Sequence, residues 1–390
     1  MTTQTQPLWL RCETKPAEHR SALTPTTARK LIDAGFAITV ERDPQRIFDD
    51  EEFEAAGCTL VDHHTWPQAP KDFPIIGLKE LDTPGPDLCH THIQFAHCYK
   101  HQEGWVDVLA RFKRGGGKLY DLEFLEDANG RRVAAFGWHA GFAGAALGLI
   151  GLADQLEGKQ LGKQTAYPNE DALLQVTRAA VETIRKHRPD GQVKSLVIGA
   201  LGRCGRGAID CLEKSGCRPE EIMRWDIQET SAKSGPYQEI VDADLFVNCI
   251  YLSKKIPSFV DHAFLEKAGK DRRLGMIVDV SCDTTNPNNP LPVYSINTTF
   301  DAPTVAVDLP EGLPKLEVIS IDHLPTLLPR EASEQFSHDL LPSLLQLPYV
   351  TGAAGPEALK HVDEEGKGAV WTRAEALFRK HLAEAEANGA

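Results

Sequence analysis

The chain has 390 residues, which predicts about two domains, and its 42% hydrophobic and 25% charged content is that of an ordinary globular protein. Its formal net charge of −14 argues against nucleic acid and anionic membranes as partners, but allows an anionic small substrate that needs only a few local cations. Nine cysteines without a CxxC motif, and no secretory apolar segment near Met1, predict reduced thiols and a cytoplasmic protein.

The first half of the chain predicts alternating strands and helices. Short apolar runs predict strands at 7–12, 36–40, 59–61 and 74–78, followed by apolar segments at 91–96 and 118–120. Helical patterns lie between these runs, at 22–34, 51–56 and 106–113. Thr24 is expected to cap the first helix, because Pro25 follows it at a position where the missing N–H of proline is tolerated. This alternation indicates a parallel sheet.

A Gly/Ala-rich segment at 133–153 is long enough to cross a membrane and carries no formal charge. Gly and Ala drive insertion weakly, His139 interrupts the segment, and no second span accompanies it, so a closely packed helix is the better interpretation. A second α/β unit follows, with strand candidates at 244–250, 275–280 and 316–321. After Pro329 the chain is helical and polar, and we expect it to pack back on the first unit.

Residues 193–212 read VKSLVIGALGRCGRGAIDCL, an apolar run that stops at a cluster of glycines before a helical pattern begins. A strand, a glycine-rich turn and a helix in that order present free N–H groups to a pyrophosphate. The glycine spacing is GxxGxxG rather than GxGxxG. Asp226 follows at the end of an apolar stretch, about 20 residues on. Its carboxylate would accept hydrogen bonds from both ribose hydroxyls and would repel a 2′-phosphate, so NAD is favoured over NADP.

Charged residues gather where two strands of the first unit end. The segment 11–25, which includes Glu18 and Arg20, follows the first strand at the ligand-binding edge of an open sheet, although a charge run is by default a solvated loop. Lys79 comes directly after the buried run PIIGL. It would be a usable base where burial and neighbouring cations favour its neutral form, or otherwise an exposed partner of Glu80.

Four histidines, His90, His92, His97 and His101, lie within residues 89–101. One interpretation is a metal site in which His97 and His101 share a helix face. Another is an acid/base histidine, and a third is surface and core histidines without a chemical role. The segment lacks a nearby cluster of Asp or Glu, and its spacing matches no standard zinc module. We therefore rank acid/base chemistry first and metal binding last, and we expect no metal.

Two further pairs could take part in chemistry. Glu123 and Arg131 lie just before the expected link between the two units. Arg131 could hold a carboxylate or phosphate through two parallel hydrogen bonds, or form a salt bridge between domains. Cys204 and Cys249 would both lie at the carboxyl edge of the second sheet. A disulfide between them is a hypothesis, although cysteine usage argues against a structural disulfide in the cytosol.

Long motifs in the right order resemble the fungal NAD-dependent, L-lysine-forming saccharopine dehydrogenases. They are ETKPAEHRSALTP, GLKE, HIQFAHCYK, YDLEFLE, GRRVAAFG, GALGRCGRGA, WDIQET, NCIYLS and SIDHLPTLLPREAS, spanning about residues 11–341. The wider superfamily, which includes alanine dehydrogenase and transhydrogenase subunits, is similar in its ALTP start and its two-domain architecture. The resemblance implies oxidative cleavage of saccharopine to lysine and 2-oxoglutarate, the last step of the α-aminoadipate route, with NAD as the cofactor.

The resemblance also implies roles for individual residues. Lys79 would be the catalytic base and His97 the catalytic acid, with Glu123 tuning the protonation of its neighbours. Residues implied to bind saccharopine are Arg20, Lys79, Gln102, Phe136, Ser281 and Asp283. Residues implied to bind NAD are Arg131, Gly202, Arg203, Asp226, Thr230, Tyr251, Val280, Ile321, Asp322, His323 and Leu324. Family members suggest a monomer.

Patterns and resemblance together predict an α/β fold with two Rossmann-like, doubly wound parallel-sheet domains and an active site in the cleft between them. Residues 1–136 with 331–390 would form the substrate-side domain, and residues 137–330 the NAD-binding domain. The alternative functions are an alanine dehydrogenase-like amino-acid dehydrogenase, a catalytically silent NAD-binding redox sensor built on Cys204 and Cys249, and, more distantly, a zinc-dependent hydrolase. The presence of both Lys79 and His97 in their motifs argues against the sensor.

Overall fold

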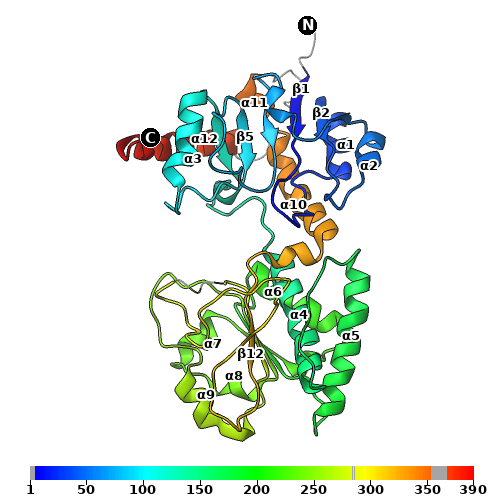
Figure 1. Cartoon of the computed structure of the whole chain (residues 1–390), viewed down its shortest axis with the longest axis vertical. Coiled ribbons are helices and arrows are strands. Elements are labelled where there is room, and N and C mark those ends of the chain that lie inside the picture. The colour runs from blue at the N-terminus through cyan, green and yellow to red at the C-terminus, as the bar shows by residue number, and fades with distance from the viewer. Residues whose placement is uncertain (1–4, 283, 285, 353–366) are drawn as a thin grey trace. The chain divides into compact units, whose positions relative to one another are not determined.

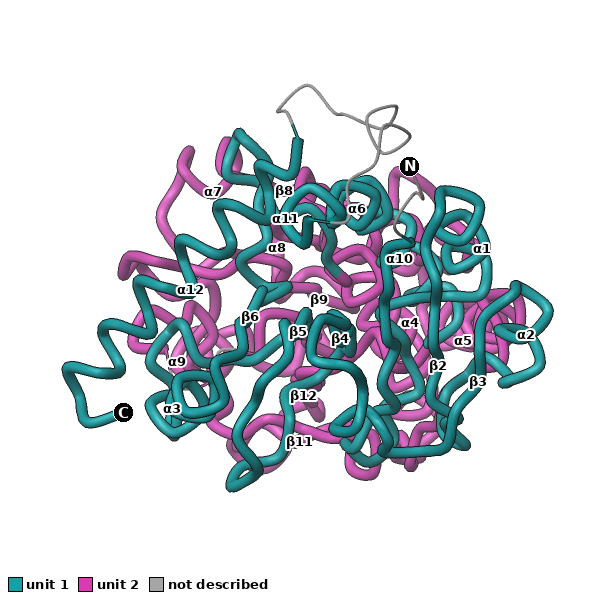
Figure 2. Tube along the Cα trace, turned by 90° about the horizontal axis from the view of Figure 1, so that it is seen from above, with its two compact units in different colours: residues 1–135, 329–390 teal, residues 136–328 magenta. Residues whose placement is uncertain are grey.

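A computed structural model describes residues 5–282, 284, 286–352 and 367–390. The chain divides into two compact units, Met1–Ala135 with Pro329–Ala390 (unit 1) and Phe136–Leu328 (unit 2), which Figure 2 shows in teal and magenta. Unit 1 is therefore built from both ends of the chain, and unit 2 from its middle. Across the part of the chain that the structure describes, no helix has the length and apolar character needed to span a bilayer.

Unit 1 contains a six-stranded sheet in the order β3-β2-β1-β4-β5-β6, and its described strand pairs are parallel (Figure 1). The strands are β1 (Gln6–Leu10), β2 (Phe36–Glu41), β3 (Thr59–Val61), β4 (Ile75–Ile76), β5 (Thr91–Gln94) and β6 (Lys118–Asp121). The helices are α1 (Pro25–Asp33), α2 (Asp50–Ala55), α3 (Trp105–Gly115), α10 (Pro329–Leu344), α11 (Pro348–Thr351) and α12 (Ala369–Ala387), with 3-10 turns η1 (Trp66–Gln68) and η2 (Leu122–Phe124). The predicted parallel sheet is confirmed.

The chain enters the unit 1 sheet at β1 in its middle, adds β2 and β3 on one side, and then adds β4, β5 and β6 on the other. The strand order therefore reverses between β1 and β4. In open parallel sheets, ligands bind beside the carboxyl ends of the strands at such a switch point. The segments that leave β1 and β4 at this point carry Glu13 and Lys79.

Two local predictions can be compared with unit 1 directly. Helix α1 begins at Pro25 behind a Thr24 N-cap, whose side chain accepts the Thr27 N–H, as the sequence predicts. Strand β4 covers only Ile75–Ile76, shorter than the predicted 74–78. Single hydrogen bonds to the β5 segment continue past Ile76, from the Gly77 N–H to the Ile93 carbonyl and from the Phe95 N–H to the Leu78 carbonyl, both at 3.0 Å, while the Leu78 and Lys79 N–H groups bond a side chain.

Unit 2 contains a second six-stranded sheet, in the order β11-β12-β10-β9-β7-β8. Strand β11 pairs antiparallel with β12, and the other described pairs are parallel. The strands are β7 (Ser195–Ile198), β8 (Ile222–Trp225), β9 (Leu245–Asn248), β10 (Met276–Asp279), β11 (Val305–Ala306) and β12 (Glu317–Ile319). The helices are α4 (Gly137–Leu156), α5 (Glu170–His187), α6 (Arg203–Lys214), α7 (Ile227–Ala232), α8 (Gln238–Asp242) and α9 (His262–Ala268), with 3-10 turns η3 (Pro219–Glu221), η4 (Gly269–Asp271) and η5 (Leu324–Leu327).

The Gly/Ala-rich segment forms α4, which packs against α5, α6 and strands β9 and β10 and is seen beside α5 and α6 in Figure 1. Its side chains are buried from Gly141 to Ala153, which explains why the segment is apolar on every side. The two helices α4 and α6 touch backbone to backbone. A Cβ added to Gly141 would lie 1.8 Å from the carbonyl oxygen of Cys204 in α6.

Replacing Gly141 by Ala should destabilise unit 2, because the new methyl group meets helix backbone that cannot move aside. Overpacking of this kind lowers the free energy of unfolding by about 1–3 kcal/mol. Thermal unfolding of the purified variant measures the effect. Gly162→Ala is the matched control, because a Cβ there meets nothing within 4 Å. Equal melting temperatures for the two variants would contradict the close approach of α4 and α6.

Candidate active site

Lys79 lies at the switch point of the unit 1 sheet, and its backbone is held from both sides. The buried Glu13 carboxylate accepts the Leu78 N–H at 2.6 Å and the Lys79 N–H at 3.0 Å. The Arg11 guanidinium donates to the Lys79 carbonyl and forms an ion pair with Glu13 at 3.3 Å. Within the described part of the chain, no carboxylate forms an ion pair with the half-buried Lys79 side chain. The backbone is thus fixed while the amine stays available.

Arg20 and Glu18 form a buried, two-point ion pair beside this lysine. The guanidinium donates from Nε to Oε1 at 2.8 Å and from Nη2 to Oε2 at 2.7 Å. Burial alone would raise the pKa of Glu18, but Arg20 and the nearby Lys79 outweigh it, so the pKa is lowered. The structure therefore places Arg20, Glu18 and Lys79 in one electrostatic cluster.

The alternative pairing of Lys79 with Glu80 is wrong. Glu80 forms an ion pair with Lys15 at 3.3 Å, and its other carboxylate oxygen lies 3.8 Å from Nε2 of His97. Burial opposes ionisation of Glu80, but hydrogen bonding together with His97 and Lys15 lowers its pKa. Glu80 therefore connects the segment after β1 with the loop after β5.

His97 lies in the loop between β5 and α3 with its imidazole between two carboxylates. Its Nε2 is 3.8 Å from Glu80 and its Nδ1 is 3.8 Å from Glu123. Its backbone φ of 51° is in the left-handed region, which side chains with a Cβ rarely adopt. Strained backbone of this kind persists where the surroundings fix it, and it clusters at functional sites.

Glu123 is held by two cations as well as by His97. Its Oε1 accepts from Lys100 at 2.7 Å and from Arg132 at 3.4 Å. Burial alone would raise its pKa, but these cations lower it, so the carboxylate is ionised beside the imidazole. Arg132, which the sequence analysis did not select, makes this contact. Arg131 is exposed, and its backbone N–H bonds Asp127 at 2.9 Å.

The histidine cluster is not one site. His97 and His101 do not share a helix face, because both lie in the loop before α3 with positive φ. His90 and His92 are buried in the core, with ring centroids 6.2 Å and 5.0 Å from that of Trp66. Burial holds the pKa of His92 well below its ordinary value.

Gln102 lies at the end of the loop before α3. Its side-chain oxygen accepts the Lys100 N–H at 3.1 Å.

Asp121 is a buried carboxyl at the end of β6 that accepts the Glu123 N–H at 2.9 Å. Burial, reinforced by the charge of Glu123 and opposed by Arg132, raises the pKa of Asp121 from 3.8 to about 7. Between these two values the folded state holds a proton that the unfolded state has lost. Stability should therefore fall as pH rises through this window.

Asp121→Asn removes this titration. Between pH 5 and pH 8, the free energy of unfolding of the variant should therefore fall by less than that of the wild type, with a difference of up to roughly 3 kcal/mol. Urea unfolding of the wild type and the variant at both pH values measures the difference. Asp72→Asn, at an exposed position of the same unit, should leave the wild-type dependence on pH unchanged. Parallel pH profiles for the wild type and Asp121→Asn would show that Asp121 is ionised throughout.

In unit 2, the glycine turn joins β7 to α6 as the sequence predicts. The strand ends at Ile198, and α6 begins at Arg203 with Gly202 as its N-cap. A Cβ on Gly205 would lie 2.1 Å from the carbonyl oxygen of Gly199, so only glycine lets the first turn of the helix lie against the turn before it. The N-terminus of a twelve-residue helix therefore follows the carboxyl end of a central strand.

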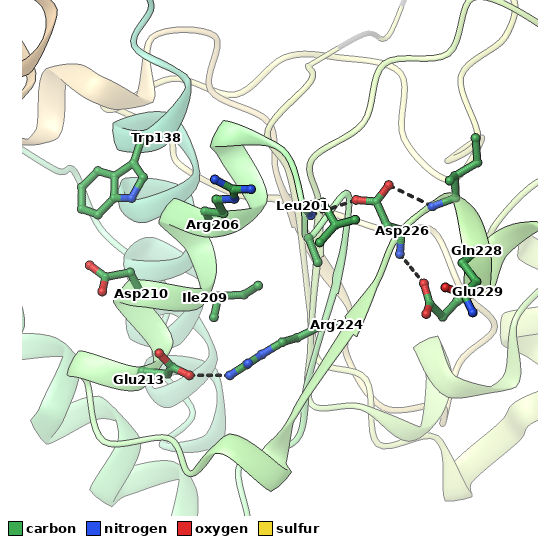
Figure 3. Close-up of a pocket in the computed structure, with 12 residues that line it drawn as sticks. Trp138, Leu201, Arg206, Ile209, Asp210, Glu213, Arg224, Asp226, Gln228 and Glu229 are labelled. Atoms are coloured by element: carbon green, nitrogen blue, oxygen red, sulfur yellow. Dashed lines mark hydrogen bonds and ion pairs between the residues drawn. The ribbon is translucent and has the colours of Figure 1, made fainter. Parts of the chain in front are cut away.

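Asp226 follows β8 and connects two loops. Its Oδ2 accepts the Leu201 N–H at 2.9 Å, and its Oδ1 accepts the Ile227 N–H at 2.9 Å (Figure 3). Thr230, one turn further along α7, donates its hydroxyl to the Asp226 carbonyl at 2.9 Å. The predicted acidic residue is thus fixed beside the glycine turn.

Two cavities of unit 2 meet at Asp226. One, of about 770 Å³, lies toward α6, where Figure 3 shows Trp138, Arg206 and Ile209 opposite Leu201 and Asp226. The other, of about 680 Å³, lies toward the loop after β9. Residues that line this second cavity include Ile198, Asp226, Thr230, Tyr237, Ile250, Tyr251 and Leu252. Three of the predicted NAD positions therefore share one cavity.

The carboxyl end of β10 carries a hydrogen-bonded network around Asp279, which the sequence analysis missed. Asp279 accepts from the Ser281 hydroxyl at 2.6 Å, from the Tyr294 hydroxyl at 2.5 Å and from the Asn248 amide at 3.0 Å. An acidic residue inside the apolar run GMIVDV, one position before its end, was the available signal. Asp283 lies outside the described residues.

The other predicted residues of unit 2 differ in how far their side chains are accessible. Phe136 is the N-cap of α4, and Arg203 is exposed at the start of α6. Val280 donates its N–H to the Asn248 carbonyl at 3.0 Å.

The segment after β12 carries four predicted residues. Ile321 and Leu324 are buried in the core, and Asp322 is exposed. His323 packs edge-on against Phe300, with ring centroids 5.1 Å apart. Ile321 and Leu324 could therefore meet a ligand only through their backbone.

Cys204 and Cys249 meet at the carboxyl edge of the unit 2 sheet, one in the first turn of α6 and the other directly after β9. Both are thiols in this structure. A hydrogen bond from Cys249 lowers the pKa of Cys204, and the same contact, together with burial, raises the pKa of Cys249. The pair is thus asymmetric, with Cys204 the readier thiolate.

The chain is similar to known proteins in both sequence and fold. The family model "Alanine dehydrogenase/PNT, N-terminal domain" matches residues 9–143. A protein of Yarrowia lipolytica named saccharopine dehydrogenase (NAD(+), L-lysine-forming) is 58% identical over 379 residues, which cover 96% of this chain and 97% of that protein. A protein of the same name from Neurospora crassa is 55% identical over 378 residues, which cover 96% of each chain.

Among solved structures, an L-alanine dehydrogenase has a TM-score of 0.59 at 16% identity, over 95% of this chain and 94% of that one. At this identity the likeness shows the fold alone, and it agrees with two mostly parallel, Rossmann-like sheets. The matches to the curated relatives extend over nearly the whole chain and so span both units. The chain belongs to the family of NAD(+)-dependent, L-lysine-forming saccharopine dehydrogenases.

Proposed function

We propose that this protein catalyses the NAD-dependent oxidative cleavage of saccharopine to lysine and 2-oxoglutarate, the last step of lysine synthesis by the α-aminoadipate route. The observation that carries the proposal is the identity of 58% to a relative named for this activity, over almost the full length of both chains. The lysine, histidine and carboxylates at the carboxyl edge of the unit 1 sheet supply the acid and base groups that such a reaction needs.

NAD fits the residues present in unit 2. The close turn at Gly205, the N-terminus of α6 and the fixed carboxylate of Asp226 match the needs of a pyrophosphate and a ribose diol. Thr230 and Tyr251 line the cavity beside Asp226. We assign the pyrophosphate to Gly202 and Arg203, and further contacts to Arg131, Val280 and Ile321-Asp322-His323-Leu324. When bound, NAD accepts the hydride from the carbon next to the bridging amine.

Lys79 is the proposed base. The bridging secondary amine has to be neutral before hydride leaves the adjacent carbon, because an ammonium nitrogen has no lone pair to form the C=N bond. The Lys79 amine would take that proton. Its backbone is fixed by Glu13 and Arg11, so the amine is presented from a rigid support.

His97 is the proposed acid. Water has to add to the imine, and the resulting carbinolamine then collapses as the lysine ε-amine departs with a proton. The imidazole would deliver that proton. Before the transfer, the ionised carboxylates of Glu80 and Glu123 would stabilise the protonated ring. Arg20, Gln102, Phe136, Ser281 and Asp283 are proposed to bind the carboxylates and chain of saccharopine.

A steady-state assay tests the proposed function. With NAD present, saccharopine should give NADH together with lysine and 2-oxoglutarate in equal amounts. Alanine should give no NADH, and a chelator should leave the rate unchanged. NADH formed from alanine and not from saccharopine would contradict the proposal and would favour an alanine dehydrogenase activity instead. NAD binding without turnover of either compound would favour a redox sensor.

We further propose that the protein works in the cytoplasm as a monomer, with unit 1 on the substrate side and unit 2 binding NAD. The net charge of −14 and the absence of a bilayer-spanning helix from the described residues support a small-molecule substrate without nucleic acid or membrane partners. Light scattering of the purified protein should give the mass of one chain.

A disulfide between Cys204 and Cys249 stays a prediction for oxidising conditions. The two thiols already contact each other, and the lowered pKa of Cys204 favours the thiolate that disulfide formation needs. Thiol titration of protein unfolded without reductant should count seven of the nine cysteines after oxidation, and all nine after reduction. A count of nine in both samples would exclude a disulfide between these two cysteines.

A further inference from the structure

We infer that unit 1 carries a binding site for a divalent transition metal of the Zn²⁺ class, formed by His101, His381 and Glu384. The loop before α3 supplies His101, and α12 supplies the other two at an i,i+3 spacing. Two imidazoles and one carboxylate form a ligand set that zinc takes in proteins, with the fourth position left to water. The proposed reaction uses none of the three residues.

The donor atoms already converge. Oε2 of Glu384 lies 2.9 Å from Nδ1 of His381 and 3.2 Å from Nε2 of His101. The three donor atoms all lie within 4.8 Å of one another. Zinc bonds to nitrogen and oxygen are about 2.0–2.2 Å long. An ion among these atoms therefore replaces two shared protons and needs only small movements of the side chains.

Packing holds the two rings independently of the carboxylate. His381 stacks on Tyr99 with ring centroids 4.4 Å apart and an interplanar angle of 12°. His101 lies against Trp105 with ring centroids 4.3 Å apart. Donors held by packing lose less conformational entropy when an ion binds.

The charges of the group also suit a cation. Its single carboxylate and two imidazoles offer the ion one formal negative charge. The described cation nearest to this carboxylate is Lys380, 3.9 Å from Oε1, on the oxygen that the imidazoles do not use.

A second cluster, Cys12 with His63 and His64, is less suited to bind zinc. The Cys12 sulfur lies 3.2 Å from Nδ1 of His64. Burial and the neighbouring Glu41 raise the pKa of Cys12 to about 12, so a metal would have to displace a tightly held proton. This cluster provides the internal comparison for the test.

Calorimetric titration of EDTA-treated full-length protein with Zn²⁺, and Co²⁺ absorption spectra, test the inference. We expect one equivalent to bind, and His101→Gln or Glu384→Gln to weaken binding at least tenfold. His101→Gln changes an exposed loop, so it reports on binding even if changes in α12 impair folding. Exposed His338→Gln should bind like the wild type.

Two outcomes would overturn the inference. One is unchanged binding in His101→Gln and Glu384→Gln together with loss in a His63→Gln/His64→Gln variant, which would move the metal to the other cluster. The other is the absence of a binding isotherm in the wild type. Both readouts are independent of turnover, so failure of the proposed enzyme activity would leave the inference intact.

Discussion

Lys79→Met should lower kcat by about 10²–10⁴-fold, because the variant has no group at this position to take the proton from the bridging amine. NAD affinity should change little, since the proposed NAD contacts in unit 2 are untouched. Stopped-flow measurement of NADH formation separates the chemical step from product release, and NAD binding is measured by fluorescence titration. The limb of the pH profile that reports the base should disappear in the variant.

Lys71→Met provides the matched control, because Lys71 is an exposed lysine of the same unit. It should turn over at the wild-type rate. If Lys79→Met retains turnover within about tenfold of the wild type, roughly 1.4 kcal/mol, then Lys79 is not the principal base.

Glu13→Gln should lower both the stability of the protein and its turnover. Both carboxylate oxygens of Glu13 accept from N–H donors, so an amide places its own NH₂ group against a donor and leaves Arg11 buried without its counter-charge. Removal of one partner from such a buried group costs about 3 kcal/mol or more. Urea unfolding measures this loss.

A purely structural role for Glu13 would lower stability alone. Because Glu13 fixes the backbone of Lys79, we expect kcat to fall by about tenfold at temperatures where the variant is fully folded, with a smaller change in KM. Glu54→Gln, on the exposed side of α2, should match the wild type in both measurements. Wild-type kcat in folded Glu13→Gln would reduce Glu13 to a stability residue.

Local patterns were sufficient to predict much of the fold. Thr24 and Pro25 start α1 because capping is decided within one turn. The glycine turn and Asp226 are found where the sequence predicts them, because a strand, a turn and a helix follow each other directly. Helix α5 received no prediction, although Asn169 as N-cap and buried residues such as Leu173 and Val181 follow a helical period.

The candidate site was less predictable, because its geometry depends on pairs that are distant in sequence or on backbone direction. Glu13 meets its N–H partners 65 and 66 positions away. The choice between Arg131 and Arg132 depends on a short antiparallel bridge that joins Glu126 to Arg132, since neighbours in extended backbone point to opposite sides. His97 and His101 are four apart, but left-handed residues replace the expected helix.

The division of unit 1 between the two ends of the chain has a consequence for synthesis on the ribosome. Helix α10 packs on α1, and its Ser333 hydroxyl accepts the N–H of Ser21 in the segment before α1. Helix α12 packs on β6 and α3. The nascent first 135 residues must therefore wait, with these faces uncovered, until the last helices are made. Unit 2 is contiguous, so it can complete its core first. A chain that ends before α12 would thus contain a folded unit 2 and an incomplete unit 1.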